Sequence, residues 1–281
     1  MHLDFSLILV VATLVTGLVW LLDKLVFKKR RAASRFQDKK PGLVVEYSNS
    51  FFPVLALVLI LRSFLFEPFQ IPSGSMLPTL KIGDFILVNK FSYGVRLPVI
   101  HTRIIPVNDP KPGDVAVFRY PLDERLNYIK RVIGVAGDKI SYENSHLHIN
   151  GQPVGRQLIE KNPVESPKEE LWQEQLGEVN YSVYNYPTPT YNFPEITVPE
   201  GYYFVMGDNR DHSNDSRFWC QAQPHNETGC LIIPGYANDR GAPLVMGFVA
   251  EENLVGRAFA VWMHWPKLLS LPKFSAIRTI E

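Results

Sequence analysis

The sequence predicts two membrane-spanning α-helices followed by a mainly antiparallel β domain. Two long apolar runs lie within the first 66 residues, and the rest of the chain alternates short apolar runs with turn residues. Proline is frequent, at 22 of 281 residues. This share of about 8%, against about 5% on average, disfavours a helical bundle. The length agrees with about two domains.

The first apolar run is Phe5 to Leu22, which carries no charge. As a helix it would reach about 27 Å, close to the roughly 30 Å hydrocarbon core of a bilayer. A cleaved secretory signal is the alternative, but such signals begin with basic residues, and the stretch from Met1 to Asp4 has no Lys or Arg. We therefore expect the first transmembrane segment within residues 1–22.

The second apolar run covers residues 51–66, with Arg62 as its only charge. Arg62 lies near the end of the run, where a long side chain can reach the lipid headgroups. Ser48, Asn49 and Ser50 precede the run as expected N-cap residues. A buried hairpin in a soluble core is the alternative for the two runs, and we favour two membrane spans.

The chain between the two runs is strongly basic. Residues 23–40 hold eight Lys or Arg and two Asp, a net charge of +6, so the rest of the chain carries −5 of the total of +1. The positive-inside rule then predicts that residues 23–50 form a cytoplasmic loop of a bacterial inner membrane protein, with residues 67–281 on the periplasmic side. The chain as a whole lacks the basic excess of a nucleic-acid-binding protein.

Short apolar runs bounded by turn residues predict the strands of the outer domain. They lie near residues 84–88, 114–118, 127–135, 146–149, 202–206 and 254–265. Asn150-Gly151 predicts a tight hairpin after the fourth run. Only Lys168 to Gln175 hints at a helical period. The Pro-, Tyr- and Asn-rich stretch within residues 140–200 indicates a smaller inserted β lobe.

Ser75 lies in a segment rich in small residues and proline, Pro72-Ser73-Gly74-Ser75-Met76-Leu77-Pro78. The prolines restrict φ, so a tight turn is expected that presents the Ser75 hydroxyl beside its own backbone N–H. Taken alone, Ser-Gly-Ser is usually an ordinary loop, so this segment does not by itself indicate catalysis.

Lys130 lies in the predicted strand over residues 127–135. Because side chains alternate along a strand, Lys130 shares a face with Tyr128 and Val132, opposite Arg131. A lysine among apolar neighbours is usually a gatekeeper of a sheet edge. The alternative is a desolvated lysine, whose pKa falls because burial disfavours the charged form. Its neutral amine could then act as general base for a serine.

Residues 207–217 are dense in Asp, Asn, Ser and Arg. A calcium loop of the EF-hand type fails here, because the sixth position lacks Gly and the twelfth lacks Glu. The pairs of acidic and basic residues fit a hydrogen-bonded scaffold better.

Together, these segments resemble the bacterial type I signal peptidases. The resemblance extends over both apolar runs and most of the outer domain, and is carried by PSGSMLPTL (72–80), GDFILVNKFSYG (83–94), GDVAVFRYP (113–121), YIKRVIGVAGD (128–138) and GDNRDHSNDSR (207–217). It implies a membrane-bound endopeptidase with the signal-peptidase β fold that removes signal peptides from exported preproteins and needs no cofactor.

The resemblance also implies residue roles. Ser75 is expected to be the nucleophile, Lys130 the general base, Ser73 an oxyanion donor with the Ser75 N–H, and Ser213 the group that orients Lys130. The implied scaffold residues are Asp208, Arg210, Asp215 and Arg217. Shallow pockets for small side chains of the preprotein would be lined by Phe69, Ile71, Met76, Leu80, Ile86, Tyr128 and Ile129.

The chain departs from the family pattern at residues 220–246, which form an extra loop with Cys220, His225 and Cys230. Three potential ligands at this spacing are a weak zinc signal, and a Cys220–Cys230 disulfide fits an oxidising compartment better. No metal is expected. Membrane-tethered preproteins and the bilayer are the expected partners, with the export translocase as a further candidate. The alternatives to an active peptidase are a catalytically silent membrane-anchored scaffold and a self-cleaving Ser–Lys regulator.

Overall fold

The computed structural model describes residues 5–28, 42–60, 66–97, 102–221, 229–237, 241, 243–266 and 270–280. The chain divides into two compact units. One contains the N-terminal helices and a short hairpin, and the other contains residues 67–94 and 106–281.

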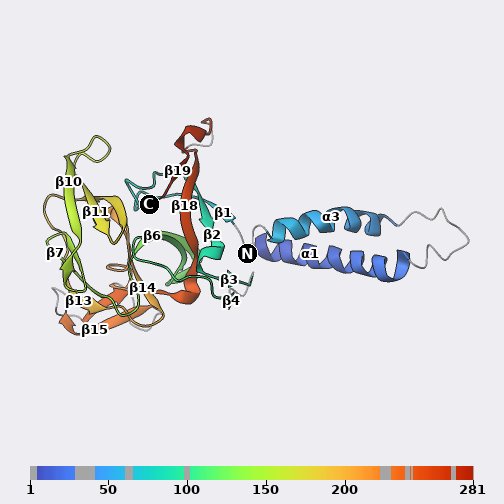
Figure 1. The fold of residues 1–281 in the computed structure, drawn as a ribbon, viewed down its shortest axis with the longest axis horizontal. Coiled ribbons are helices and arrows are strands. Elements are labelled where there is room, and N and C mark those ends of the chain that lie inside the picture. The colour runs from blue at the N-terminus through green and yellow to red at the C-terminus, as the bar shows by residue number, and fades with distance from the viewer. Residues whose placement is uncertain are drawn as a thin grey trace, which may run out of the picture. The chain divides into compact units, whose positions relative to one another are not determined.

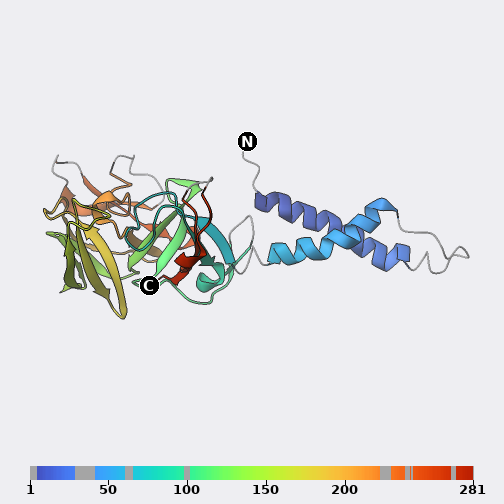
Figure 2. The ribbon, with the colours of Figure 1, turned by 90° about the horizontal axis from the view of Figure 1, so that it is seen from above.

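Two apolar helices lie side by side in the N-terminal unit (Figures 1 and 2). Helix α1 spans Phe5–Leu22 and continues into a π-helical turn, η1, at Asp23–Phe27, and α3 spans Leu43–Ile60. They pack closely at Gly17, where a Cβ would lie 2.7 Å from the ring of Phe52. Leu7–Phe27 and Leu43–Ile60 are long and apolar enough to cross a membrane. This unit also holds the hairpin of β3 (Val95–Arg96) and β4 (Arg103–Ile105).

The first helix matches the expected bounds, whereas α3 begins eight residues before the expected Phe51. Ser48, Asn49 and Ser50 lie inside α3 and do not cap it. The Ser50 hydroxyl donates to the carbonyl of Glu46 at 3.1 Å, so the polar side chain is satisfied within the helix. Residues 29–41, which include most of the basic segment, and residues 61–65, which include Arg62, lie outside the described part of the chain.

The larger unit is built on a mainly antiparallel sheet. Its strand order is β1-β2-β18-β5-β6-β14-β17, with β19 also paired to β18. The strands are β1 (Phe66–Gln70), β2 (Asp84–Asn89), β5 (Val115–Tyr120), β6 (Asp123–Gly134), β14 (Tyr202–Met206), β17 (Val249–Ala250), β18 (Leu254–His264) and β19 (Arg278–Thr279). The first and last parts of the outer domain therefore meet in one sheet, as Figure 1 shows for β2 and β18.

Three smaller sheets complete this unit. One has the order β10-β11-β12 and another the order β13-β7-β8-β9, while β15 and β16 form a hairpin. Their bounds are β7 (Lys139–Glu143), β8 (His146–Ile149), β9 (Gln152–Pro153), β10 (Gly155–Lys161), β11 (Glu170–Leu176), β12 (Val179–Asn185), β13 (Phe193–Thr197), β15 (Cys230–Ala237) and β16 (Pro243–Gly247). Single 3₁₀ turns lie at Lys90–Tyr93, Arg210–His212, Glu251–Asn253 and Phe274–Ala276.

All six predicted strands are present, and the hairpin at Asn150-Gly151 is confirmed. Asn150 and Gly151 have φ of 53° and 74°, and β8 pairs with β9 directly across them. The helical hint at Lys168 to Gln175 is wrong, because β11 covers most of it. The side chains of Glu174 and Leu176 are buried while Gln173 and Gln175 are exposed, which is the alternation of a strand with one packed face and one face in solvent.

Strand β6 separates two apolar clusters and keeps the predicted alternation. Val132 and Tyr128 pack on one side with Phe118, whereas Ile129 packs with Val117 in another cluster. Lys130 lies on the same strand with its side chain buried.

Candidate functional site

The turn that carries Ser75 connects β1 to β2 and is held by backbone atoms. The Leu80 N–H donates to the carbonyl of Met76 at 2.8 Å, which closes the turn locally. Asn209 fixes it from outside: its backbone N–H donates to the carbonyl of Ser75 at 3.1 Å, and its side-chain amide donates to the carbonyl of Gly74 at 3.1 Å. Two parts of the chain that are far apart in sequence therefore fix the position of the Ser75 hydroxyl.

Lys130 and Ser75 are in direct contact. The Lys130 Nζ lies 2.6 Å from the Ser75 Oγ, and it also donates to the carbonyl of Ile129 at 3.0 Å. As an ammonium, Nζ would donate to Oγ, whereas a neutral amine would accept the hydroxyl proton. Both side chains are buried, with Lys130 4% exposed and Ser75 9% exposed. The 2.6 Å distance is short enough for direct proton transfer between the hydroxyl and a neutral amine.

The surroundings of Lys130 favour its neutral form. Burial is the dominant effect and lowers the pKa of Lys130 from 10.5 to about 8, even though the carboxylates of Asp215 and Asp208 oppose the change. Arg217 lowers the pKa further. An amine with a pKa near 8 is a usable base at neutral pH, which an ordinary lysine is not.

Ser73 also lies close to the predicted nucleophile. Its Oγ is 3.5 Å from the Oγ of Ser75, and its side chain is exposed. A hydroxyl at this place can reach an oxygen that develops next to Ser75, together with the Ser75 backbone N–H.

The segment 207–217 packs against the turn of Ser75. Gly207 is the point of closest approach, since a Cβ there would lie 2.3 Å from the Ser213 Oγ and 2.4 Å from the carbonyl oxygen of Ser75. The hydroxyl of Ser213 is thus brought next to the Ser75 turn, but among the described contacts no hydrogen bond joins it to Lys130. The role expected for Ser213 stays a prediction.

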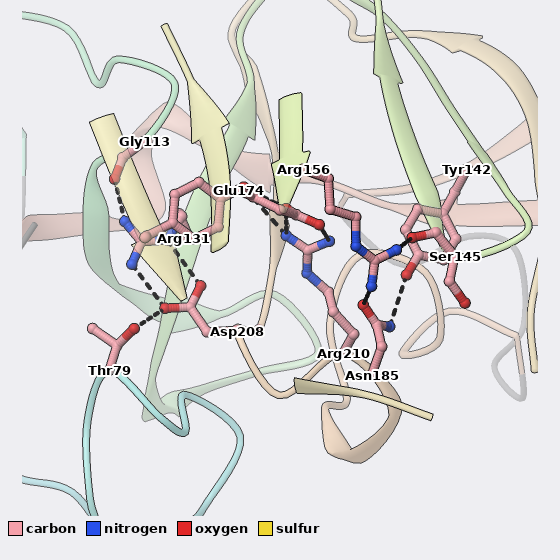
Figure 3. A network of polar contacts seen from close by, with 12 residues as sticks. Thr79, Gly113, Arg131, Tyr142, Ser145, Arg156, Glu174, Asn185, Asp208 and Arg210 are labelled. Atoms are coloured by element: carbon pink, nitrogen blue, oxygen red, sulfur yellow. Dashed lines mark hydrogen bonds and ion pairs between the residues drawn. The ribbon is translucent and has the colours of Figure 1, made fainter. Parts of the chain in front are cut away.

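The four expected scaffold residues are buried and paired. Asp208 accepts two hydrogen bonds from Arg131, at 2.8 and 2.7 Å, and a third from the Thr79 hydroxyl at 2.5 Å (Figure 3). Arg217 donates to both oxygens of Asp215 at 2.8 Å. Each pair has the two-point geometry that makes Arg–carboxylate contacts strong.

The fourth scaffold residue, Arg210, pairs outside the loop. It donates to the carboxylate of Glu174 on β11 at 3.0 and 2.5 Å. Burial is the largest single influence and lowers the pKa of Arg210, but the Glu174 carboxylate, Tyr181 and Tyr142 together outweigh it and hold the pKa well above its ordinary value. Arg210 is therefore a permanent buried cation.

Six of the seven expected pocket residues gather in one apolar cluster. Tyr128 lies in another, with its ring centroid 5.5 Å from the Lys130 Nζ. The six are Phe69, Ile71, Met76, Leu80, Ile86 and Ile129.

Sequence reasoning missed several residues that shape the site. Asn209 and Gly207 lie within the recognised polar segment, so their types were visible but their contacts were not. Thr79 and Glu174 carried no local signal, because their partners are 129 and 36 residues away.

Cys220 and Cys230 form a disulfide with their Cα atoms 5.5 Å apart. It ties the end of the segment 207–219 to the start of β15, within the expected extra loop 220–246. Residues 222–228, which include His225, and residues 238–240 and 242 lie outside the described part of this loop.

Comparisons with known proteins identify the family. Residues 44–265 match the family described as signal peptidase, peptidase S26. The chain is 48% identical to a signal peptidase I from Pseudomonas fluorescens and 45% identical to one from Pseudomonas aeruginosa, and both alignments cover all of each chain. A crystal structure of a signal peptidase I from Enterococcus faecalis shares 25% identity, with a TM-score of 0.30, over 54% of this chain and 97% of that one.

Proposed function

Because the chain belongs to the signal peptidase family, peptidase S26, its function is the removal of signal peptides from preproteins, and we propose that Ser75 and Lys130 perform the hydrolysis. The observation that carries the proposal is the 2.6 Å contact between the Ser75 Oγ and the buried Lys130 Nζ. No cofactor is needed, because a hydroxyl and an amine supply the nucleophile and the base.

In the first half of the reaction, Lys130 accepts the Ser75 proton while Oγ attacks the scissile carbonyl. The oxygen of the tetrahedral intermediate is stabilised by the Ser75 N–H and the Ser73 hydroxyl. The Lys130 ammonium then gives its proton to the leaving amine, which departs as the new N-terminus of the mature protein. An ester between Ser75 and the signal peptide remains.

In the second half, the neutral Lys130 accepts a proton from water, whose oxygen attacks the ester. The intermediate collapses, Ser75 takes the proton back from Lys130, and the signal peptide leaves with a free carboxylate. Ser213 orients the amine, while Asp208, Arg210, Asp215 and Arg217 hold the loop that carries it.

The substrates are preproteins with a signal peptide, and the apolar cluster beside Ser75 supports a preference for small residues before the cut. Ile71, Met76 and Ile86 are almost fully buried, at 3%, 0% and 0% exposed, so we propose that they form an apolar floor beneath shallow pockets that would exclude large side chains sterically. The Tyr128 ring lies 5.5 Å from the Lys130 Nζ, and we propose it as a further wall of these pockets.

The protein is anchored in the membrane by its apolar helices. We infer from the charge of residues 23–40 that this segment is cytoplasmic and that the β unit acts on the periplasmic side of a bacterial inner membrane, in contact with lipid and beside the export translocase. We also interpret the small sheets of residues 140–200 as an inserted lobe, and residues 220–246 as an extra loop.

A catalytically silent membrane-anchored scaffold is the second candidate function. The burial of Lys130 disfavours this alternative. Keeping a lysine neutral costs about 3 kcal/mol, from a fall of about 2.5 in its pKa, and a protein that only binds gains nothing from this cost.

The test is cleavage of a purified preprotein in detergent by the wild type, Ser75→Ala and Lys130→Ala, with Lys139→Ala as the matched control. Lys139 lies on β7 with its side chain 57% exposed, so its loss should leave cleavage unchanged. We expect no cleavage above background for Ser75→Ala and Lys130→Ala, with wild-type circular dichroism. Cleavage that survives in Ser75→Ala would refute the proposed nucleophile.

A further inference from the structure

The sheet β10-β11-β12 reaches the polar loop 207–217 through one buried ion pair. Glu174 on β11 and Arg210 in the loop are 1% and 0% exposed, and both terminal nitrogens of Arg210 donate to the carboxylate (Figure 3). The Tyr181 hydroxyl on β12 donates to the same carboxylate at 2.9 Å and accepts from Arg210 at 3.2 Å. Because a guanidinium stays charged, its position in the interior depends on this carboxylate.

The fixed position of Arg210 also restricts the rest of the loop 207–217, through hydrogen bonds that involve Arg217 and Asp215. Its backbone carbonyl accepts a hydrogen bond from Arg217 at 2.6 Å, and Arg217 in turn holds Asp215. Asp215 accepts from the Gly207 N–H at 2.9 Å, which closes the loop at its start. Ser213 lies between these fixed points, on the stretch of loop that Arg210 and Arg217 define.

Strand β12 and the residue that follows it, Tyr186, add hydrogen bonds on both sides of Arg210. The Tyr184 N–H donates to the carbonyl of Asp208 at 3.0 Å, and the Tyr186 N–H donates to the carboxylate of Asp211 at 2.7 Å. These contacts show that the first part of the loop, residues 208–211, is docked against β12 and Tyr186. Glu174 differs from them because it is the contact whose loss leaves a buried charge unpaired.

We propose that Glu174 is a positioning residue for the peptidase reaction, fixing through Arg210 the loop that holds Ser213 beside the Ser75–Lys130 pair. The proposal deepens the proposed function and rests on it. Glu174 touches neither reacting group, so its effect must pass through the loop.

The charges that face Lys130 give the direction of the expected effect. The carboxylates of Asp215 and Asp208 raise its pKa, Arg217 lowers it, and the Tyr128 ring lies against it, but burial is the largest influence. A loop released from Glu174 would admit water to the amine. Weaker desolvation returns the pKa of Lys130 toward its ordinary value, so the activity should move to higher pH.

The experiment measures kcat/KM for preprotein cleavage in detergent between pH 6 and 10.5. Glu174→Gln keeps the shape of the side chain and removes its charge. Glu178→Gln is the matched control, because Glu178 is exposed in the turn between β11 and β12. We expect Glu174→Gln to lose about tenfold or more at pH 7, to recover partly by pH 10, and to have its midpoint about one pH unit higher, while Glu178→Gln follows the wild type.

A double variant separates positioning from general stability. Glu174→Met/Arg210→Met removes both charges, and such apolar replacements of buried pairs restore stability. If Glu174 positions the loop, the melting temperature of the double variant returns to that of the wild type while its pH midpoint stays high. A midpoint that returns together with the melting temperature, or a Glu174→Gln profile that falls equally at every pH, would overturn the proposal.

The Ser75→Ala variant in the same assay separates the two proposals. If the wild type cleaves and Ser75→Ala does not, the proposed function holds whatever Glu174→Gln does. Cleavage that does not depend on Ser75 would instead remove the proposed function itself.

Discussion

The pH dependence of cleavage tests the central feature of the site, the desolvated Lys130. With a pKa of about 8, roughly 9% of the amine is neutral at pH 7, against about 0.03% for a lysine at 10.5. The buried position therefore raises the concentration of active base about 300-fold at neutral pH. If Lys130 is the general base, as we propose, only its neutral form is active, so activity should rise with pH and level off above the midpoint.

The assay is initial cleavage of a preprotein at a concentration well below KM, in detergent, from pH 5.5 to 10.5. Since one proton must leave Lys130, kcat/KM should rise about tenfold per pH unit below the midpoint and become flat above pH 9. Lys130→Arg should be inactive throughout, because its guanidinium cannot lose a proton, whereas Lys139→Arg should match the wild type.

A midpoint near 10.5 would show that Lys130 is not desolvated in the working enzyme. A flat profile through pH 8 would show that no group with this pKa limits the reaction. Either result would refute the assignment of Lys130 as a buried neutral base, independently of whether Ser75 is the nucleophile.

Four further predictions address the surroundings of the site. Gly207→Ala should lower kcat/KM at least 100-fold, because its Cβ would clash with the Ser75 carbonyl and the Ser213 hydroxyl. The control Gly155→Ala should cleave normally, because its Cβ would lie in ordinary contact, 3.7 Å from the Gln175 Cβ. Lys130→Met should raise the free energy of unfolding in urea by up to about 3 kcal/mol below pH 8, because the pKa of Lys130 is lower in the folded state than in the unfolded state. This gain in stability should shrink as the pH rises to about 10.5, the ordinary pKa of a lysine. An equal gain at all pH values would contradict the prediction. Arg131→Met should lower the free energy of unfolding in urea by about 3–5 kcal/mol, because it leaves the buried Asp208 carboxylate without its cation. The control Arg125→Ala, on an exposed ion pair, should leave the urea midpoint of unfolding unchanged. Cys220→Ala/Cys230→Ala should lower stability by about 3 kcal/mol from loop entropy alone, and an unchanged melting temperature would show that the disulfide contributes nothing.

Local patterns in the sequence predicted the elements well and their long-range contacts poorly. The alternation around Lys130 was sufficient to predict β6, and Asn150-Gly151 was sufficient to predict the hairpin of β8 and β9. Strands and tight hairpins depend on the preferences of neighbouring residues, which the sequence shows directly. The start of α3 was missed because Ser48 and Ser50 read as caps, whereas the helix satisfies Ser50 internally. The apolar spacing of residues 168–175 suggested a helix, whereas in the structure β11 buries one face of this polar stretch.

In the candidate site, too, local motifs could be predicted from the sequence and long-range contacts could not. The segments of Ser75, Lys130 and Ser213 could be recognised because each is a contiguous motif. Glu174 and Thr79 could not, since their roles depend on which distant arginine or aspartate the fold places against them. A single chain gives residue types and spacing, but ion pairs between separate sheets depend on tertiary packing.

Arg278 on β19 contacts both the turn that carries Ser75 and the start of β2. Arg278 donates to the carbonyl of Thr79 at 3.1 Å and to the carboxylate of Asp84 at 2.6 Å, across 199 and 194 residues. These contacts form only when residues that are 194 to 199 positions apart in the chain come together. The conformation of the turn that carries Ser75 therefore depends on β19 as well as on the residues next to the turn.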